Sequence, residues 1–229
     1  MTQFYRQEDK HLVSVDCIIL GFRDKDIHVL IINRKFEPLK GERSLMGGFV
    51  RENENLNDTV ARVVGEYTGI DHVYMEQVGA YGDVKRDIGE RVISIVYYAL
   101  INLQLFDERL KKRHHAEWIN INDVGKLILD HNLFLKDTLS LLRRRTATRP
   151  VGFNLLPEKF TLPQLQSLYE AIHQRPLDKR NFRKKVTEMD ILEKLDEKDK
   201  SSSKRGAYYY KFNKEKYDRL LEDGCYFSL

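Results

Sequence analysis

Apolar residues in the first part of the chain fall into short dense runs separated by polar turns. Residues 12–22 and 27–34 are rich in Ile and Val, and the polar segment 23–26 joins them. Residues 73–81 and 92–100 form two similar runs. Runs of this length and composition are typical of β-strands. The pattern therefore predicts a sheet with at least four strands.

Two segments show helical spacing instead. In residues 56–68 the apolar positions recur every three or four residues, and Gly69 follows as a stop. Residues 132–145 carry a leucine stripe and end in three arginines. Cations suit the negative end of a helix dipole, so these arginines have a local explanation. We predict one helix in each segment.

Helix-start signals mark the second part of the chain. Residues 149–152 are the best candidate linker. Thr161 with Gln164 three residues later forms a capping-box pattern, and Phe160 and Leu165 occupy the hydrophobic-staple positions. The pattern predicts a helix that begins after Thr161 and closes at Arg175 and Pro176.

A second, basic helix is predicted to follow closely. Asp178 can cap a helix reaching Met189, in which Phe182 and Val186 point inward. Its remaining positions are largely basic and outward. Two short helices with a tight connection are typical of a helix-turn-helix. The basic loop 200–206 and the aromatic run 207–212 then read as a wing and its strand.

Charge supports a division at about residue 148. Residues 1–142 hold 19 Lys+Arg against 22 Asp+Glu, whereas residues 143–229 hold 20 against 13. We therefore predict domains at 1–148 and 149–229, the second with nucleic acid as its partner. Cys17 and Cys225 form no disulfide or zinc pattern, and no apolar run is long enough for a membrane. We expect a cytoplasmic protein.

The richest motif begins at Gly48. Five residues separate it from Glu54, seven more separate Glu54 from Arg62, and Glu66 and Gly69 follow. This spacing resembles the Nudix box of hydrolases that cleave nucleoside diphosphates linked to another group. In that family the helix carboxylates hold divalent cations beside the diphosphate.

The chain departs from the box at two positions that matter. Val63 and Tyr67 stand where the family has glutamates. Positions 63, 66 and 67 share one helix face, so that face keeps a single carboxylate. We expect no catalytic residues, no metal and no cofactor, and Mg²⁺ only if the chain is a hydrolase after all.

The two halves together resemble the NrtR-like transcription regulators, on the strength of residues 160–185 and the box. The resemblance implies an α+β chain, with an N-terminal Nudix α/β/α sandwich followed by a C-terminal winged helix-turn-helix domain. It also implies a homodimer on palindromic double-stranded operators. Many members sense ADP-ribose and control NAD metabolism, and a branch with degenerate boxes senses L-arabinose. The substitutions at Val63 and Tyr67 favour the arabinose branch and a repressor of pentose utilisation.

Two sets of site residues follow from this reading. The expected DNA contacts are Lys179, Arg180, Asn181, Arg183, Lys184, Lys185, Lys204 and Arg205. The expected effector contacts are Arg43, Phe49, Tyr81 and Glu66. Three alternatives stay open: an active hydrolase of ADP-ribose or a related compound, an ADP-ribose-sensing regulator, and a basic module that docks an acidic protein.

Overall fold

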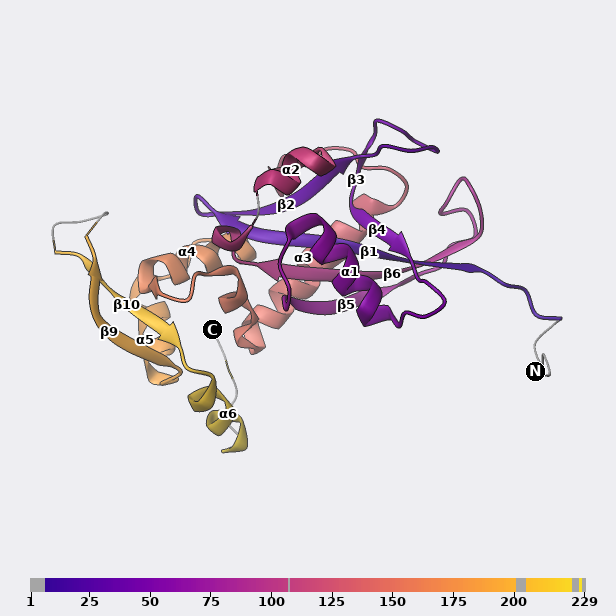
Figure 1. Cartoon of the computed structure of the whole chain (residues 1–229). Coiled ribbons are helices and arrows are strands. Elements are labelled where there is room, and N and C mark those ends of the chain that lie inside the picture. The colour runs from indigo at the N-terminus through magenta and orange to yellow at the C-terminus, as the bar shows by residue number, and fades with distance from the viewer. Residues whose placement is uncertain (1–6, 107, 201–204, 224–226, 228–229) are drawn as a thin grey trace.

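The computed structural model describes residues 7–106, 108–200, 205–223 and 227, and it has two packed parts (Figure 1). The first part contains β1 (Leu12–Arg23), β2 (Asp26–Asn33), β3 (Arg43–Ser44), β4 (Met46–Phe49), α1 (Leu56–Thr68), β5 (Tyr74–Tyr81), β6 (Val92–Ile101), α2 (Glu108–His114), β7 (Ala116–Asn120) and α3 (His131–Thr148). The second contains β8 (Phe160–Thr161), α4 (Leu162–His173), α5 (Lys179–Glu188), β9 (Leu192–Asp199), β10 (Ala207–Phe212) and α6 (Lys214–Glu222). Short 3₁₀ turns lie at Leu103–Leu105 and Pro150–Leu155.

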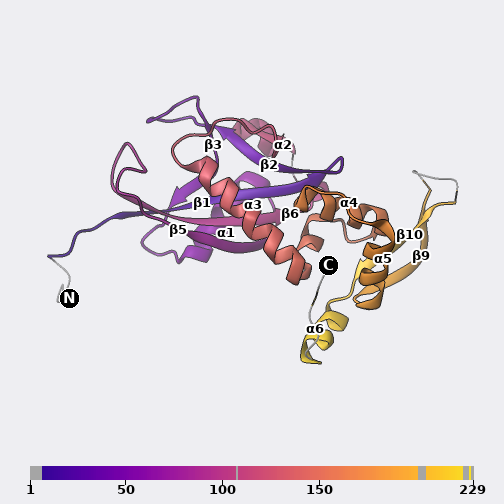
Figure 2. The same cartoon turned by 180° about the vertical axis from the view of Figure 1, so that it is seen from behind.

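The first part is built around one mixed sheet in the order β3-β2-β1-β6-β5, with β4 added to β1 and β7 to β2. β1 and β6 run parallel, and the other pairs are antiparallel. β1 is buried on both faces. Ile18 and Leu20 pack on the side of α3, whereas Cys17 and Ile19 pack on the side of α1. Helices on both faces make the expected α/β/α sandwich, and Figure 2 shows α3 crossing the rear face of the sheet.

The second part is the expected winged helix. α4 begins at the capping box of Thr161 and Gln164, and both staple residues, Phe160 and Leu165, are fully buried. α5 begins at Asp178, whose side chain accepts the backbone N–H of Asn181 at 2.7 Å. The strands order as β8-β10-β9, all antiparallel. α5 follows α4 after a short connection, and it packs on α4 through Phe182, which contacts Tyr169.

The sequence pattern did not predict β3, β4, β7, β8, β9, α2 or α6, and one predicted helix is longer. β9 carries mostly charged residues with little apolar alternation, and α2 is only seven residues long. α3 extends to His131 and Thr148, beyond the predicted 132–145. Tertiary packing decides such segments more than their local pattern.

The two parts share one hydrophobic cluster. Phe134 and Leu142 of α3 belong to the same buried group as Leu155, Phe160 and Leu165. The linker predicted at 149–152 is therefore a packed turn at the junction. Within the described ranges, no helix has the length and apolar character that crossing a membrane requires.

Candidate functional site: an effector cleft and a basic helix

The loop between β4 and α1 is held by one ion pair. Arg62 Nε donates to Glu54 Oε1 at 2.6 Å, and Arg62 Nη2 donates to Glu54 Oε2 at 2.8 Å. Thr59 Oγ1 donates to the same carboxylate at 3.0 Å. The hydrogen bonds from Arg62 lower the pKa of Glu54 to about 2. The carboxylate of Glu54 thus serves to hold the loop between β4 and α1 in place.

The helix face that carries metal ligands in Nudix hydrolases is different here. Val63 is 1% exposed and belongs to the core beneath the sheet. Tyr67 is half-buried, and its ring lies 4.6 Å from that of His114. Glu66 is exposed and contributes nothing to the cleft lining.

A magnesium ion does not fit this arrangement. Hard cations need several oxygen ligands, and this face offers one carboxylate, with Glu54 already bound to Arg62. Over the described part of the chain, no group of three or more His, Cys, Asp or Glu side chains is arranged to hold a metal.

A cleft of about 450 Å³ opens beside the box, between β1, β4, the start of α3 and the loops 34–39 and 86–90. Aromatic and basic side chains line it, including Arg34, Phe36, Phe49, Tyr67 and Arg86. The Arg34 guanidinium lies 4.1 Å from the centre of the Phe36 ring, and its Nε donates to the Pro38 carbonyl at 2.7 Å. This size and lining suit a small organic ligand with an aromatic part and a charged part.

The floor of the cleft is formed by Asp16 on β1 and His131 at the start of α3. Ser94 donates a short hydrogen bond to Asp16 Oδ2. Leu45 N donates to His131 Nδ1 at 3.1 Å, and His131 Nε2 lies 3.7 Å from Asp16 Oδ1. Burial lowers the pKa of His131. Gly47 leaves room for Asp16, because a Cβ at this glycine would lie 2.5 Å from Asp16 Oδ1.

Of the expected effector contacts, only Phe49 lines the cleft. Arg43 Nη1 donates to the Val124 carbonyl at 3.3 Å, and Tyr81 donates to Asp137 at 2.8 Å. The sequence analysis missed Asp16, Arg34 and His131. No local pattern marks these residues, since they come together only through the sheet and α3.

The predicted DNA-binding helix has its basic face toward solvent. Phe182 is 5% exposed and packs against Tyr169, whereas Lys179, Arg180, Asn181 and Lys185 are exposed. Lys184 is exposed and lies 3.7 Å from Glu188. Arg183 is half-buried, and its buried Nε has no hydrogen-bond partner among the described residues. Arg205 is exposed at the wing, and Lys204 lies outside the described residues.

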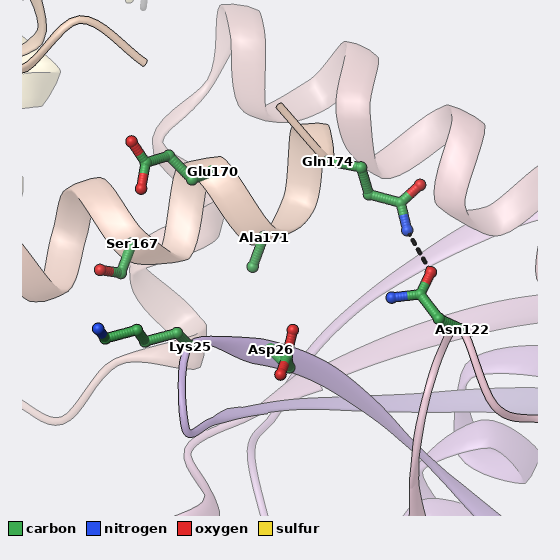
Figure 3. A pocket seen from close by; sticks show the side chains of 7 residues that line it. All are labelled: Lys25, Asp26, Asn122, Ser167, Glu170, Ala171 and Gln174. Atoms are coloured by element: carbon green, nitrogen blue, oxygen red, sulfur yellow. Dashed lines mark hydrogen bonds between the residues drawn. The ribbon is translucent and has the colours of Figure 1, made fainter. Parts of the chain in front are cut away.

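A second hollow, of about 400 Å³, separates the two parts of the molecule (Figure 3). Lys25 in the turn after β1 and Asp26 at the start of β2 lie on one side of it, and Ser167 and Ala171 of α4 lie on the other. At its edge Gln174 donates to Asn122 Oδ1 at 2.7 Å. The hollow is open and its walls are polar, whereas pockets for drug-sized ligands are enclosed and mostly apolar. We therefore interpret it as a junction between the two parts.

Two protein families match the chain. Residues 10–142 match the NUDIX domain, and residues 152–212 match the NrtR DNA-binding winged helix domain. The matched ranges agree with the two parts of the fold.

Two curated proteins are similar in sequence. The ADPR responsive transcriptional repressor NtrR of Acinetobacter baylyi is 34% identical over 219 residues, which cover 92% of this chain and 87% of the relative. The ADP-ribose pyrophosphatase of Methanocaldococcus jannaschii is 36% identical over 128 residues, which cover 55% of this chain and 71% of the relative.

Two solved structures extend the comparison. NrtR of Shewanella oneidensis, in complex with a 27mer DNA, is 27% identical with a TM-score of 0.82, over 90% of this chain and 95% of that one. The NUDIX domain of the same protein in complex with ADP ribose is 26% identical with a TM-score of 0.51, over 62% of this chain and 99% of that one.

Proposed function

Since this chain belongs to the NrtR family, which joins a Nudix domain to a DNA-binding winged helix, we propose that it is a transcriptional repressor whose operator affinity falls when an effector fills the Nudix cleft. The observation that carries this proposal is the exposed basic face of α5 on a winged helix that shares its core with the sensor domain. A recognition helix of this kind enters the major groove of DNA. Arg183 and Asn181 are the residues that read base edges, and Lys179, Arg180, Lys184, Lys185, Lys204 and Arg205 contact mainly phosphate.

The effector is ADP-ribose or a close relative of it. The Acinetobacter repressor is named for its response to this compound, and the cleft offers groups for each of its parts. Phe36 and Phe49 provide aromatic faces for a base, and Arg34 provides a cation for a diphosphate. Glu37, Asp87 and Glu90 also line the cleft, where their oxygens can accept hydrogen bonds from sugar hydroxyls.

L-arabinose is the second candidate effector. The loss of carboxylates at Val63 and Tyr67 favours it, because a neutral sugar needs no metal. A pentose has neither a base to stack on Phe49 nor an anion to pair with Arg34, however. The cleft chemistry therefore favours ADP-ribose over the arabinose prediction.

Hydrolysis is not part of the proposed function. The ADP-ribose pyrophosphatase relative covers only the Nudix half of the chain, and the box here has Val63 and Tyr67 in place of two glutamates. With Glu54 bound to Arg62, the cleft can hold a diphosphate ligand but lacks the means to assemble a metal site for its cleavage.

The repressor acts as a homodimer in this proposal. Two copies would place their α5 helices about one turn of B-DNA apart, or roughly 34 Å, on a palindromic operator. Sedimentation of the free chain and of its complex with operator DNA tests this, and a single copy on each operator would contradict it.

The decisive experiment is selection of sheared genomic DNA by the purified full chain at physiological salt. It is performed without ligand, with ADP-ribose and with L-arabinose. Discrete fragments that are retained without ligand and released by ADP-ribose support the whole proposal. Release by arabinose alone assigns the other effector, and the absence of any enriched fragment contradicts the repressor function. An Arg183→Ala variant serves as the control for retention through α5.

A further inference from the structure

The floor of the effector cleft contains a hydrogen-bond acceptor and a donor for which the described residues provide no hydrogen-bond partner. Asp16 is 8% exposed, and Ser94 satisfies only its Oδ2. Within the described part of the chain, no donor reaches Asp16 Oδ1 within hydrogen-bonding distance. His131 Nε2 lies 3.7 Å from Asp16 Oδ1, which is too long for a hydrogen bond.

The state of His131 follows from its other nitrogen. Nδ1 accepts the backbone N–H of Leu45, so in the neutral ring the proton is on Nε2. Nε2 is therefore a donor, and it lies beside the free oxygen of Asp16. Asp16 and His131 both line the cleft, so one molecule bound there can satisfy this donor and this acceptor together.

A hydroxyl group is the simplest chemical group that does this. It donates one hydrogen bond and accepts others, so one hydroxyl can donate to Asp16 Oδ1 and accept from His131 Nε2. A phosphate oxygen at neutral pH cannot donate to Asp16 and would be repelled by it. A sugar hydroxyl matches both partners, and water can take its place when the cleft is empty.

His131 also connects the cleft with the winged helix. It is the first residue of α3, which spans 18 residues and so about 27 Å. Near the far end of α3, Arg143 Nε donates to the Ile172 carbonyl of α4 at 3.0 Å, and Thr146 lies 3.3 Å from His173. Figure 2 shows α3 running across the sheet toward the part of the molecule that contains α4.

We propose that Asp16 and His131 together bind a sugar hydroxyl of the effector, and that this contact is what couples the occupied cleft to α3 and the winged helix. The inference rests on the proposed function, since it assigns the residues that read the sugar part of that effector. It holds for a ribose-containing effector and for L-arabinose alike.

The first test compares Asp16→Asn with Asp137→Asn in the full chain. An asparagine that keeps its oxygen toward Ser94 presents an amide N–H where the hydroxyl needs an acceptor. Asp137 is the matched control, because it also accepts one hydrogen bond, from Tyr81, but does not line the cleft. ADP-ribose affinity, measured by calorimetry, should fall about tenfold or more in Asp16→Asn alone. Operator binding without ligand should stay unchanged in Asp137→Asn.

The outcomes separate this inference from the proposed effector. If the wild-type chain binds ADP-ribose and Asp16→Asn binds it equally well, the inference is wrong. If the wild-type chain binds L-arabinose and not ADP-ribose, the proposed effector is wrong, and the same variants are then compared with arabinose. A wild-type chain that binds neither sugar compound overturns both.

A measurement on the wild-type chain covers the case in which Asp16→Asn does not fold. Histidine labelled with ¹⁵N reports each ring nitrogen, and the His131 signal is assigned by its loss in His131→Gln. Saturating ADP-ribose, or L-arabinose if that is the ligand bound, should shift the Nε2 resonance of His131 while Nδ1 remains bonded to Leu45. A bound ligand that leaves the Nε2 resonance unchanged contradicts the inference.

Discussion

The side chain of Gln174 donates to Asn122 Oδ1 at 2.7 Å and accepts a hydrogen bond from Arg143 Nη2 at 2.5 Å. One residue at the end of α4 thus joins the turn after β7 to the last part of α3 (Figure 3). Gln174 has a φ of 51°, in the left-handed region. The winged helix is therefore attached to the sensor domain by polar contacts as well as by the shared core.

Replacement of Gln174 by glycine should weaken the communication between the two domains. Glycine tolerates the positive φ, so the variant removes the side chain with little strain. We expect the effector-induced change in operator affinity to shrink by about 0.5–2 kcal/mol, while each ligand alone binds as before. Fluorescence anisotropy of labelled operator with and without effector measures this. Arg175→Ala, at the exposed next residue, is the control, and equal coupling in both variants contradicts the prediction.

Arg183→Ala should reduce operator affinity by about 1–3 kcal/mol and relax the preference at one base pair. The reason is that Arg183 lies in the middle of α5, and an arginine on a helix in the major groove can donate two hydrogen bonds to guanine. Lys185→Ala should instead weaken all duplexes alike and flatten the salt dependence by about one phosphate contact.

Competition binding with single-base operator variants at two salt concentrations distinguishes these two effects. Lys126→Ala, at an exposed lysine of the sensor domain, should change neither quantity. Unchanged operator binding in Arg183→Ala and Lys185→Ala together would move the DNA interface away from α5.

Glu54 should stabilise the protein in a pH-dependent way. Its pKa is lowered from the ordinary glutamate value of 4.5 to about 2 in the folded chain, mainly by the hydrogen bonds from Arg62. The contribution is therefore fully present above about pH 4.5 and is lost as the pH falls toward 2. The melting temperature of Glu54→Gln should lie below that of the wild type at pH 7, and the gap should narrow at pH 3.

The partner variant tests whether the ion pair is the cause. In an Arg62→Gln background, the further change Glu54→Gln should have little effect at pH 7, as a double-mutant cycle requires of a coupled pair. Additive losses in melting temperature would assign the effect of Glu54 to other contacts.

Restoration of the missing glutamate at position 63 should destabilise the fold. Val63 is 1% exposed in the core, so Val63→Glu buries a charge without a partner and should cost about 3 kcal/mol or more. Val84→Glu, at a residue that is 74% exposed, is the matched control and should have little effect. Urea unfolding measures both. Equal stability of Val63→Glu and the wild type would contradict this prediction. It would mean that a glutamate at position 63 can reach solvent or a metal ion.

Magnesium should leave the wild-type chain unaffected. We expect the same melting temperature in EDTA and in millimolar Mg²⁺, and no turnover of ADP-ribose, because the helix face has one carboxylate where a metal site needs several. Magnesium-dependent release of AMP from ADP-ribose, abolished by Glu66→Gln, would instead establish the hydrolase alternative.

The sequence by itself determined the elements that depend on local chemistry. α4 and α5 begin at the predicted caps, Thr161 and Asp178, because capping hydrogen bonds join residues only three positions apart. α1 ends at the predicted stop, Gly69. The burial of Phe182 and the apolar character of Val63 also follow from spacing along one helix. The excess of Lys and Arg in the second half of the chain is also a property of the sequence alone, and it predicted a basic DNA-binding surface there.

Only the tertiary structure decided the floor of the cleft and the link between the domains. Asp16, Ser94 and His131 lie on β1, β6 and α3, and only the parallel pairing of β1 with β6 and the packing of α3 bring them together. Arg43 and Tyr81 were expected at the cleft from their approximate place in the fold, yet their side chains bond to Val124 and Asp137 elsewhere. The direction of a side chain depends on strand register and neighbouring layers, which a local pattern does not specify.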